Sequence, residues 1–119
     1  MERCKVMSKD GVSYPEAKVL LPATSKSASF NSDKFAVNNN ENVQIELHTI
    51  SSSSLACTAK IQGSLDGSSW LTLDSTTATI TGDDDILWSL SDVDALMHLR
   101  VAVTRTAGSA IFTINYRGV

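Results

Sequence analysis

The sequence predicts an all-β chain: an antiparallel β-sandwich, jelly-roll-like, with about eight strands and an extended N-terminal arm. Apolar and polar residues alternate along several short segments, as they do in strands that have one face in a core. Turn residues separate these segments at spacings of about 8 to 12 residues. Ser and Thr are abundant and Pro is limited to two residues. No long stretch repeats apolar residues at helical spacing, which favours strands over helices.

Length and charge suggest how the chain is divided. Its 119 residues suffice for one domain whose core needs no metal or disulfide. We expect an arm over residues 1–29 and a β-sandwich body over residues 30–119. Residues 1–34 have a net charge of +2, from six Lys and Arg against four Asp and Glu, and residues 35–119 have −5, from four against nine. This asymmetry fits an arm that reaches an acidic surface, including another copy of the body, and it fits equally well a chance distribution of surface charge.

The arm contains a candidate interaction segment, an apolar triplet between two lysines: Lys18, Val19, Leu20, Leu21 and Lys26. Pro22 is expected to end the one short strand, residues 17–21. Because so short a segment cannot hold a core alone, its apolar side chains must dock on this body or on another chain.

The first half of the body is expected to form three strands. A short strand from Phe30 to Val37 leads into a polar turn at residues 38–42. Alternation then predicts strands at residues 43–50 and 55–62. The four serines at residues 51–54 are expected to form the loop between them.

The most specific feature is the hairpin predicted after residue 62. Asp66 tolerates left-handed backbone angles and Gly67 has no Cβ, so the chain can reverse tightly there. Trp70 is expected to pack inward and cover the end of the apolar layer. The structural hairpin set is Gly63, Ser64, Asp66, Gly67 and Trp70.

The second half of the body is expected to alternate strands with short connections. Its strands are residues 77–81, 86–90, 97–104 and 110–116. Its connections are an acidic turn at residues 82–85, one helical turn at residues 91–96 and a hairpin turn at Ala107-Gly108-Ser109. Each sheet then has one apolar and one wet face, so two sheets can enclose one core, although a closed barrel also fits the pattern.

Few residues indicate chemistry. His48 and His98 are at strand positions opposite the apolar ones, and no nucleophile elbow accompanies either, so hydrogen-bonded or solvated imidazoles are expected rather than catalytic bases. The acidic turn at Asp83–Asp85 supplies too few of the about six to eight ordered oxygens that calcium needs. Residues 63–67 are not followed by the Lys-Ser/Thr pair and helix of a phosphate loop. The sequence predicts no catalytic, cofactor or metal site.

Composition bears on other classes of function. Cys4 and Cys57 are too few for a disulfide framework or a metal cluster. No run approaches the about 20 apolar residues of a membrane span, and residues 1–23 lack the features of a secretory signal. The acidic body argues against nucleic acid as a partner. Trp70 and Trp88 could stack on sugars, but a tryptophan beside a hairpin in a small sandwich more often covers the core.

Two groups of residues carry a resemblance to a known family: Gly63, Ser64, Asp66, Gly67 and Trp70 at the hairpin, then Arg100, Thr104, Arg105, Thr106 and Gly108 before the last strand. In these, residues 30–119 resemble small virion proteins of tailed bacteriophages. The resemblance implies a structural β-sandwich that decorates or cements the phage head, or an accessory module of neck, tail or fibre. Carbohydrate-binding sandwich domains use a similar Ser-x-Asp-Gly-x-x-Trp hairpin, so a glycan-binding module is the alternative.

The resemblance also implies partners and a location. We expect no enzymatic activity and no cofactor. The expected partners are copies of the chain itself, as a dimer or trimer, and the major capsid protein or another virion protein. The expected location is the virion, assembled in the host bacterial cytoplasm.

Overall fold

The computed structural model describes residues 5–7, 13–15, 17–37, 41–93 and 97–118. The regular elements are strands: β1 (Lys5–Met7), β2 (Ser13–Pro15), β3 (Lys18–Lys26), β4 (Phe30–Asn31), β5 (Phe35–Val37), β6 (Glu41–Ser64), β7 (Leu71–Thr72), β8 (Ala78–Ile80), β9 (Asp84–Val93) and β10 (Met97–Gly118). Within these residues no helix is long and apolar enough to cross a membrane.

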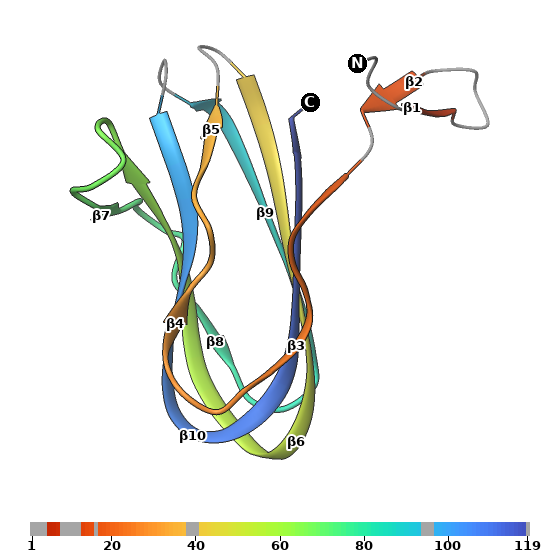
Figure 1. The fold of residues 1–119 in the computed structure, drawn as a ribbon, viewed down its shortest axis with the longest axis vertical. Coiled ribbons are helices and arrows are strands. Elements are labelled where there is room, and N and C mark those ends of the chain that lie inside the picture. The colour runs from red at the N-terminus through yellow and green to blue at the C-terminus, as the bar shows by residue number, and fades with distance from the viewer. Residues whose placement is uncertain (1–4, 8–12, 16, 38–40, 94–96, 119) are drawn as a thin grey trace.

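Two long strands, β6 and β10, organise the fold. They pair antiparallel from His98 opposite Ser64 to Gly118 opposite Val43, with register shifts between Arg105 and Ala110. Figure 1 shows both ribbons bending back at the same end of the molecule. Because both strands bend while they stay paired, each contributes one half to each of two facing sheets.

Shorter strands complete the two sheets. In the sheet that we call the first sheet, β3 pairs with the second half of β10, and β9 pairs with the first half of β6. In the second sheet, β4 and β5 pair with the first half of β10, and β7 and β8 pair with the second half of β6. Two antiparallel sheets with these connections form a jelly roll, which confirms the fold class predicted from the sequence.

The core lies between the two sheets. Alternate side chains of β6 and β10 point into it, and β8 contributes Ile80. The largest fully buried side chains are Ile45, Leu47, Ile61, Ile80, Leu99, Ile114, Val43 and Val101. Their period of two is the alternation that predicted these strands.

The predictions of a loop at residues 51–54 and of a hairpin turn at residues 107–109 were wrong. Both segments are bends inside continuous strands, β6 and β10. Gly108 takes a left-handed φ of 76° at the bend, and the Ser53 and Ser109 hydroxyls lie 3.2 Å apart across it. Small polar residues and glycine permit a sharp bend as readily as a reversal, so the sequence pattern does not separate the two.

The predicted interaction segment is an edge strand of the first sheet. β3 pairs with β10 of the same chain, from Lys26 opposite Ala110 to Lys18 opposite Tyr116. Leu20 and Leu21 pack against the core, while Val19 is exposed. Register shifts in this pairing turn both leucines toward the core and hide the alternation of a strand. The boundary expected after residue 29 therefore does not separate an arm from the sandwich.

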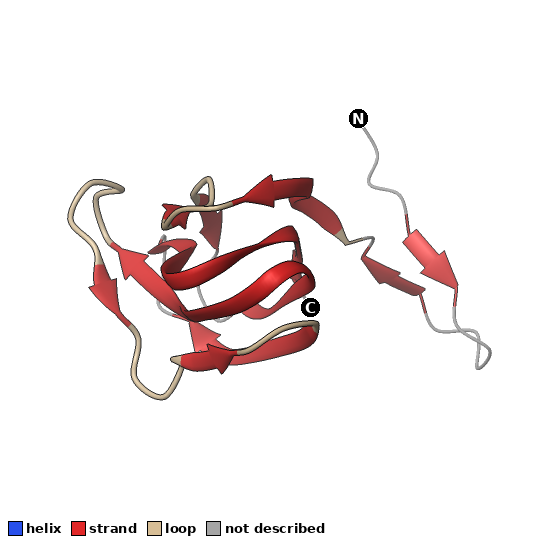
Figure 2. Cartoon of the chain, turned by 90° about the horizontal axis from the view of Figure 1, so that it is seen from below, coloured by secondary structure: helices blue, strands red, loops and turns tan. Residues whose placement is uncertain are grey.

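β1 and β2 form a separate two-stranded sheet in which Val6 is opposite Tyr14. Figures 1 and 2 both show this pair to one side of the sandwich. Of the predicted arm, this pair is the described part that is not in the sandwich.

Three further expectations fall on, or next to, residues that the structure does not describe. β9 continues to Val93, so no helical turn begins at Ser91, and residues 94–96 lie outside the described residues. β6 already begins at Glu41, while residues 38–40 of the predicted polar turn also lie outside them. Cys57 is a free, buried thiol in the core, whereas Cys4 is not among the described residues.

Candidate functional site

The predicted hairpin connects β6 to β7, which pair through Gln62 with Thr72 and Gly63 with Leu71. Figure 1 shows that it projects from the side of the second sheet. Gly67 has a left-handed φ of 79°, as the turn prediction requires. The structure thus places Gly63, Ser64, Asp66 and Gly67 together in one projecting loop, which we call the hairpin loop (residues 63–71).

The Asp66 carboxylate organises the hairpin loop. Its Oδ1 accepts hydrogen bonds from the Ser68 and Ser69 backbone N–H groups at 2.8 Å each and from the Ser64 hydroxyl at 2.9 Å. The bonds from Ser69 and Ser68, with that from Ser64, lower the pKa of Asp66 to about 2. The Ser64 hydroxyl also accepts the Gly67 N–H at 2.9 Å. These bonds fix the loop in one shape.

The fixed loop holds two leucines in solvent. Leu65 is 77% exposed and Leu71 is 76% exposed. Together with Leu73 they line a shallow depression of about 360 Å³ on the loop. Single exposed leucines are common on protein surfaces, but these leucines adjoin one depression, and a contiguous apolar patch on a protein surface is a candidate interaction site.

Trp70 does not pack inward as predicted. It is half-buried, and the Arg100 guanidinium lies 4.2 Å from its ring centroid. Arg100 Nε also donates to Gln62 Oε1 at 2.9 Å. Arg100 alternates with the buried Leu99 and Val101, so this contact is on the outer face of the second sheet. Trp70 precedes the paired residues of β7, and strand alternation therefore does not determine its side.

The tryptophan in the core is Trp88. It is 7% exposed, and its Nε1–H donates to the Thr76 carbonyl at 2.7 Å. A buried indole cannot stack on a sugar, and Arg100 covers one face of the other indole, Trp70.

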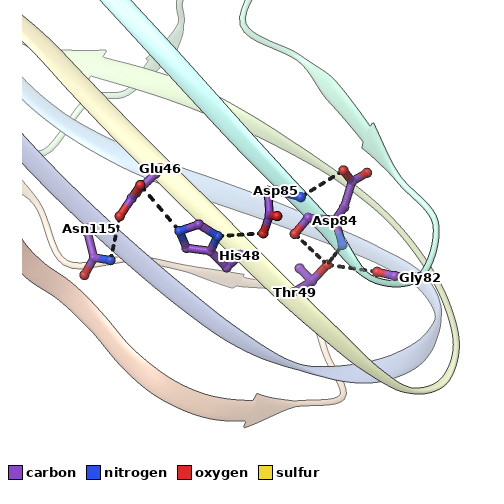
Figure 3. A network of polar contacts seen from close by, with 7 residues as sticks. All are labelled: Glu46, His48, Thr49, Gly82, Asp84, Asp85 and Asn115. Atoms are coloured by element: carbon purple, nitrogen blue, oxygen red, sulfur yellow. Dashed lines mark hydrogen bonds and ion pairs between the residues drawn. The ribbon is translucent and has the colours of Figure 1, made fainter.

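A chain of polar side chains crosses the outer face of the first sheet (Figure 3). Asn115 Nδ2 donates to Glu46 Oε1 at 2.9 Å, and Glu46 Oε2 lies 3.4 Å from His48 Nε2. On the other side of the ring, His48 Nδ1 lies 2.6 Å from Asp85 Oδ1. The bond with Asp85 raises the pKa of His48, and the bond from Asn115 lowers the pKa of Glu46. His48 is thus a hydrogen-bonded imidazole between two carboxylates.

The acidic turn is also held by hydrogen bonds. Thr49 Oγ1 donates to the Gly82 carbonyl at 2.8 Å and accepts the Asp84 N–H at 3.0 Å, as Figure 3 shows. Asp83 Oδ1 accepts the Ser51 N–H at 2.6 Å. Among the described residues, no three His, Cys, Asp or Glu side chains are grouped as metal ligands would be.

Apolar side chains are exposed on the same face of the first sheet. Val19 is 63%, Ile50 61% and Leu87 62% exposed. A depression of about 400 Å³ lies beside Leu87, lined also by Glu46, Asn115 and Arg117. We call this surface the sheet depression. Because the polar side chains around it are already bonded to one another, covering them leaves few unpaired polar groups.

The position of His48 between Asp85 and Glu46 predicts a pH-dependent stability. The pKa of His48 is higher in the folded chain than its ordinary value of 6.5. Protonated His48 therefore stabilises the folded chain fully below pH 6.5, and this stabilisation is lost as the pH rises through the pKa of the folded state. The side chains of His48 and Asp85 are 40% and 81% exposed, so the effect is small.

We expect His48→Gln to destabilise the chain by about 0.5–1 kcal/mol at pH 5.5 and by less at pH 8.5, measured by urea unfolding. Asp85→Asn is the matched control and should remove most of the pH dependence. An equal loss for His48→Gln at both pH values would contradict the assignment.

The sequence analysis did not identify the exposed leucines of the hairpin loop or the bonded side chains on the first sheet as candidate site residues. Leu65 was visible as the one large apolar residue inside a polar turn, and that signal was available. The pairing of His48 with Asp85, 37 residues apart, was not visible, because it depends on the register between β6 and β9.

The chain matches no protein-family profile, and no curated protein sequence matches it. Among solved structures, it is similar to a chain in the structure of infectious bursal disease virus, Gx strain, with a TM-score of 0.53 and 11% identity over 98% of this chain. It spans 36% of that viral chain. It is also similar to TmCBM61, solved in complex with β-1,4-galactotriose, with a TM-score of 0.50 and 8% identity over 82% of this chain and 69% of that one. At these identities the likenesses establish a shared fold, the jelly-roll sandwich.

Proposed function

We propose that this chain is a non-enzymatic structural protein of a tailed-phage virion, which decorates or cements the capsid through protein–protein contacts. The observation that carries the proposal is the hairpin loop. Hydrogen bonds among Ser64, Asp66 and Gly67 fix this loop, and these residues also carry the sequence resemblance. The fixed loop holds Leu65 and Leu71 in solvent. A loop that is ordered before binding loses little entropy on binding, and apolar anchors contribute most of the energy of an interface.

A second observation supports cementing rather than simple attachment. The hairpin loop and the sheet depression belong to different sheets, and both expose apolar side chains on a rigid backbone. A module with two such surfaces can join two neighbouring subunits. Repetition over the many equivalent sites of a shell then gives high avidity from weak single contacts.

The glycan-binding alternative has less support. Trp88 is buried, and Trp70 has one face covered by Arg100, so neither offers an open stacking platform of the kind sugars use. Turnover is not expected either, since both ring nitrogens of His48 are engaged by carboxylates.

The test uses heads of the phage that encodes the chain, produced without its gene. We expect the purified chain to co-sediment with these heads and to raise the temperature at which they release DNA. The double variant Leu65→Ser/Leu71→Ser should bind at least about tenfold more weakly, because burying a leucine contributes about 1.5–3 kcal/mol. Thr72→Ala, on the same hairpin, is the control and should bind like the wild type.

Other outcomes would redirect or overturn the proposal. Recovery of the chain only from purified tails would support a neck, tail or fibre role. Absence from all virion parts, together with binding to a glycan array that Trp70→Ala abolishes, would overturn it in favour of glycan binding.

A further inference from the structure

We propose that the hairpin loop of one copy docks into the sheet depression of a second copy, so that copies associate head to tail. This inference concerns the chain alone and does not depend on the virion. It rests on the shape, the exposed side chains and the charge of the two surfaces.

One of the two surfaces projects from the molecule and the other is hollowed. The hairpin loop projects from the second sheet and presents Leu65 and Leu71, the two most exposed of the large hydrophobic side chains in the described residues. The sheet depression has a volume of about 400 Å³ and is open to solvent. Leu87, 62% exposed at its side, gives it an apolar wall.

The two surfaces also offer one pair of opposite charges, Arg100 beside the hairpin loop and Asp85 on the outer face of the first sheet. Arg100, at the base of the hairpin loop, is fixed by Trp70 and Gln62, and among the described residues no carboxylate pairs with it. On the first sheet, the Asp85 side chain is 81% exposed and His48 engages its Oδ1. Glu46 and Arg117 line the sheet depression with opposite charges, and each is already bonded to neighbouring side chains. A guanidinium held in place can bind a carboxylate with two parallel hydrogen bonds. The one acidic group of the loop, Asp66, is already engaged by three hydrogen bonds inside it.

The two surfaces cannot meet within one copy. The hairpin loop is on the β7 side of the molecule and the first sheet is on the β3 side, at opposite sides of Figure 1. The contact is therefore between copies and joins two different surfaces, which produces rings if the rotation closes and filaments if it does not.

Two variants of the full chain test the pairing of the surfaces. The loop variant is Leu65→Ser/Leu71→Ser, and the depression variant is Leu87→Arg, which adds bulk and repels Arg100. All three leucines are exposed, so both variants should keep the wild-type melting temperature. Thr79→Arg, an exposed site on β8, is the matched control.

Light scattering coupled to size exclusion, over a range of concentrations and without any phage component, gives the result. We expect the wild type and Thr79→Arg to associate, and each of the two variants alone to need at least about tenfold higher concentration. An equimolar mixture of the two variants should form a one-to-one heterodimer and nothing larger, because it retains one intact loop and one intact depression.

Each other outcome would overturn the proposal. If the depression variant alone still forms dimers, loop contacts loop. If the loop variant alone still forms dimers, sheet contacts sheet. If the wild type stays monomeric at every concentration, or the mixture of variants stays monomeric while the wild type associates, the two surfaces do not bind each other. A monomeric wild type that still binds heads would leave the proposed function intact.

Discussion

Replacing Gly108 by alanine is expected to destabilise the chain by about 2–5 kcal/mol. Gly108 is at the bend of β10 with a φ of 76°, where a residue with a Cβ is strained by about 1–2 kcal/mol. The new Cβ would also lie 2.5 Å from the Ser53 carbonyl oxygen and closer still to that of Ser54. These are backbone atoms of the paired strand β6, so relief requires the two strands to separate, at a further cost of about 1–3 kcal/mol.

Gly82→Ala separates the two contributions. Gly82 has a φ of 93°, but a Cβ there would meet no atom within 4 Å. Gly82→Ala should therefore lower the free energy of unfolding by the backbone strain alone, about 1–2 kcal/mol. Urea unfolding of both variants measures the difference, and equal losses would show that the bend can accommodate a side chain.

Trp88→Ala is expected to lower the free energy of unfolding by about 3–5 kcal/mol, as other truncations of large core side chains do. The substitution removes a side chain that is 7% exposed and leaves the Thr76 carbonyl without its 2.7 Å hydrogen bond. Trp88→Phe should recover most of the packing but not the hydrogen bond, so its loss should be intermediate.

Trp70→Ala is the matched comparison, with an expected loss of about 1 kcal/mol, because its main contact is a partly exposed cation–π pair with Arg100. Thermal unfolding of the three variants checks the order. A larger loss for Trp70→Ala than for Trp88→Ala would restore the sequence-based expectation that Trp70 covers the core.

The alternation of apolar and polar residues was sufficient to predict the fold class. In β6, Val43, Ile45 and Leu47 all face the core, and in β10, Leu99 and Val101 do the same. The signal is strong there because each strand has one dry and one wet face. The position of Trp88 was accessible by the same logic, since it alternates with Leu87 and Ser89, which are exposed.

The connections between these segments could not be read in the same way. Residues 51–54 and 107–109 carry serines and glycine, which suit both a loop and a bend in a paired strand. Only the partner strand distinguishes the two cases, and the partner is distant in sequence. For β3, the register shifts removed the alternation itself, so Leu20 and Leu21 looked like part of an arm.

The candidate surfaces were predictable only in part. Asp66 and Gly67 were recognised as a turn because their backbone preferences are local. The exposure of Leu71 and the contact of Arg100 with Trp70 depend on where the second sheet ends, which is a property of the assembled fold.

The central place of β10 has a consequence for synthesis of the protein. Its two halves lie in the middle of both sheets, between β6 and the strands β3, β4 and β5. When synthesis has reached the end of β9, the strands β7, β8 and β9 can already pair with β6, but β3, β4 and β5 still lack the strand with which they pair. Neither sheet is complete until residues 97–118 have been made, and until then the apolar face of β6 lacks the core side chains that β10 contributes.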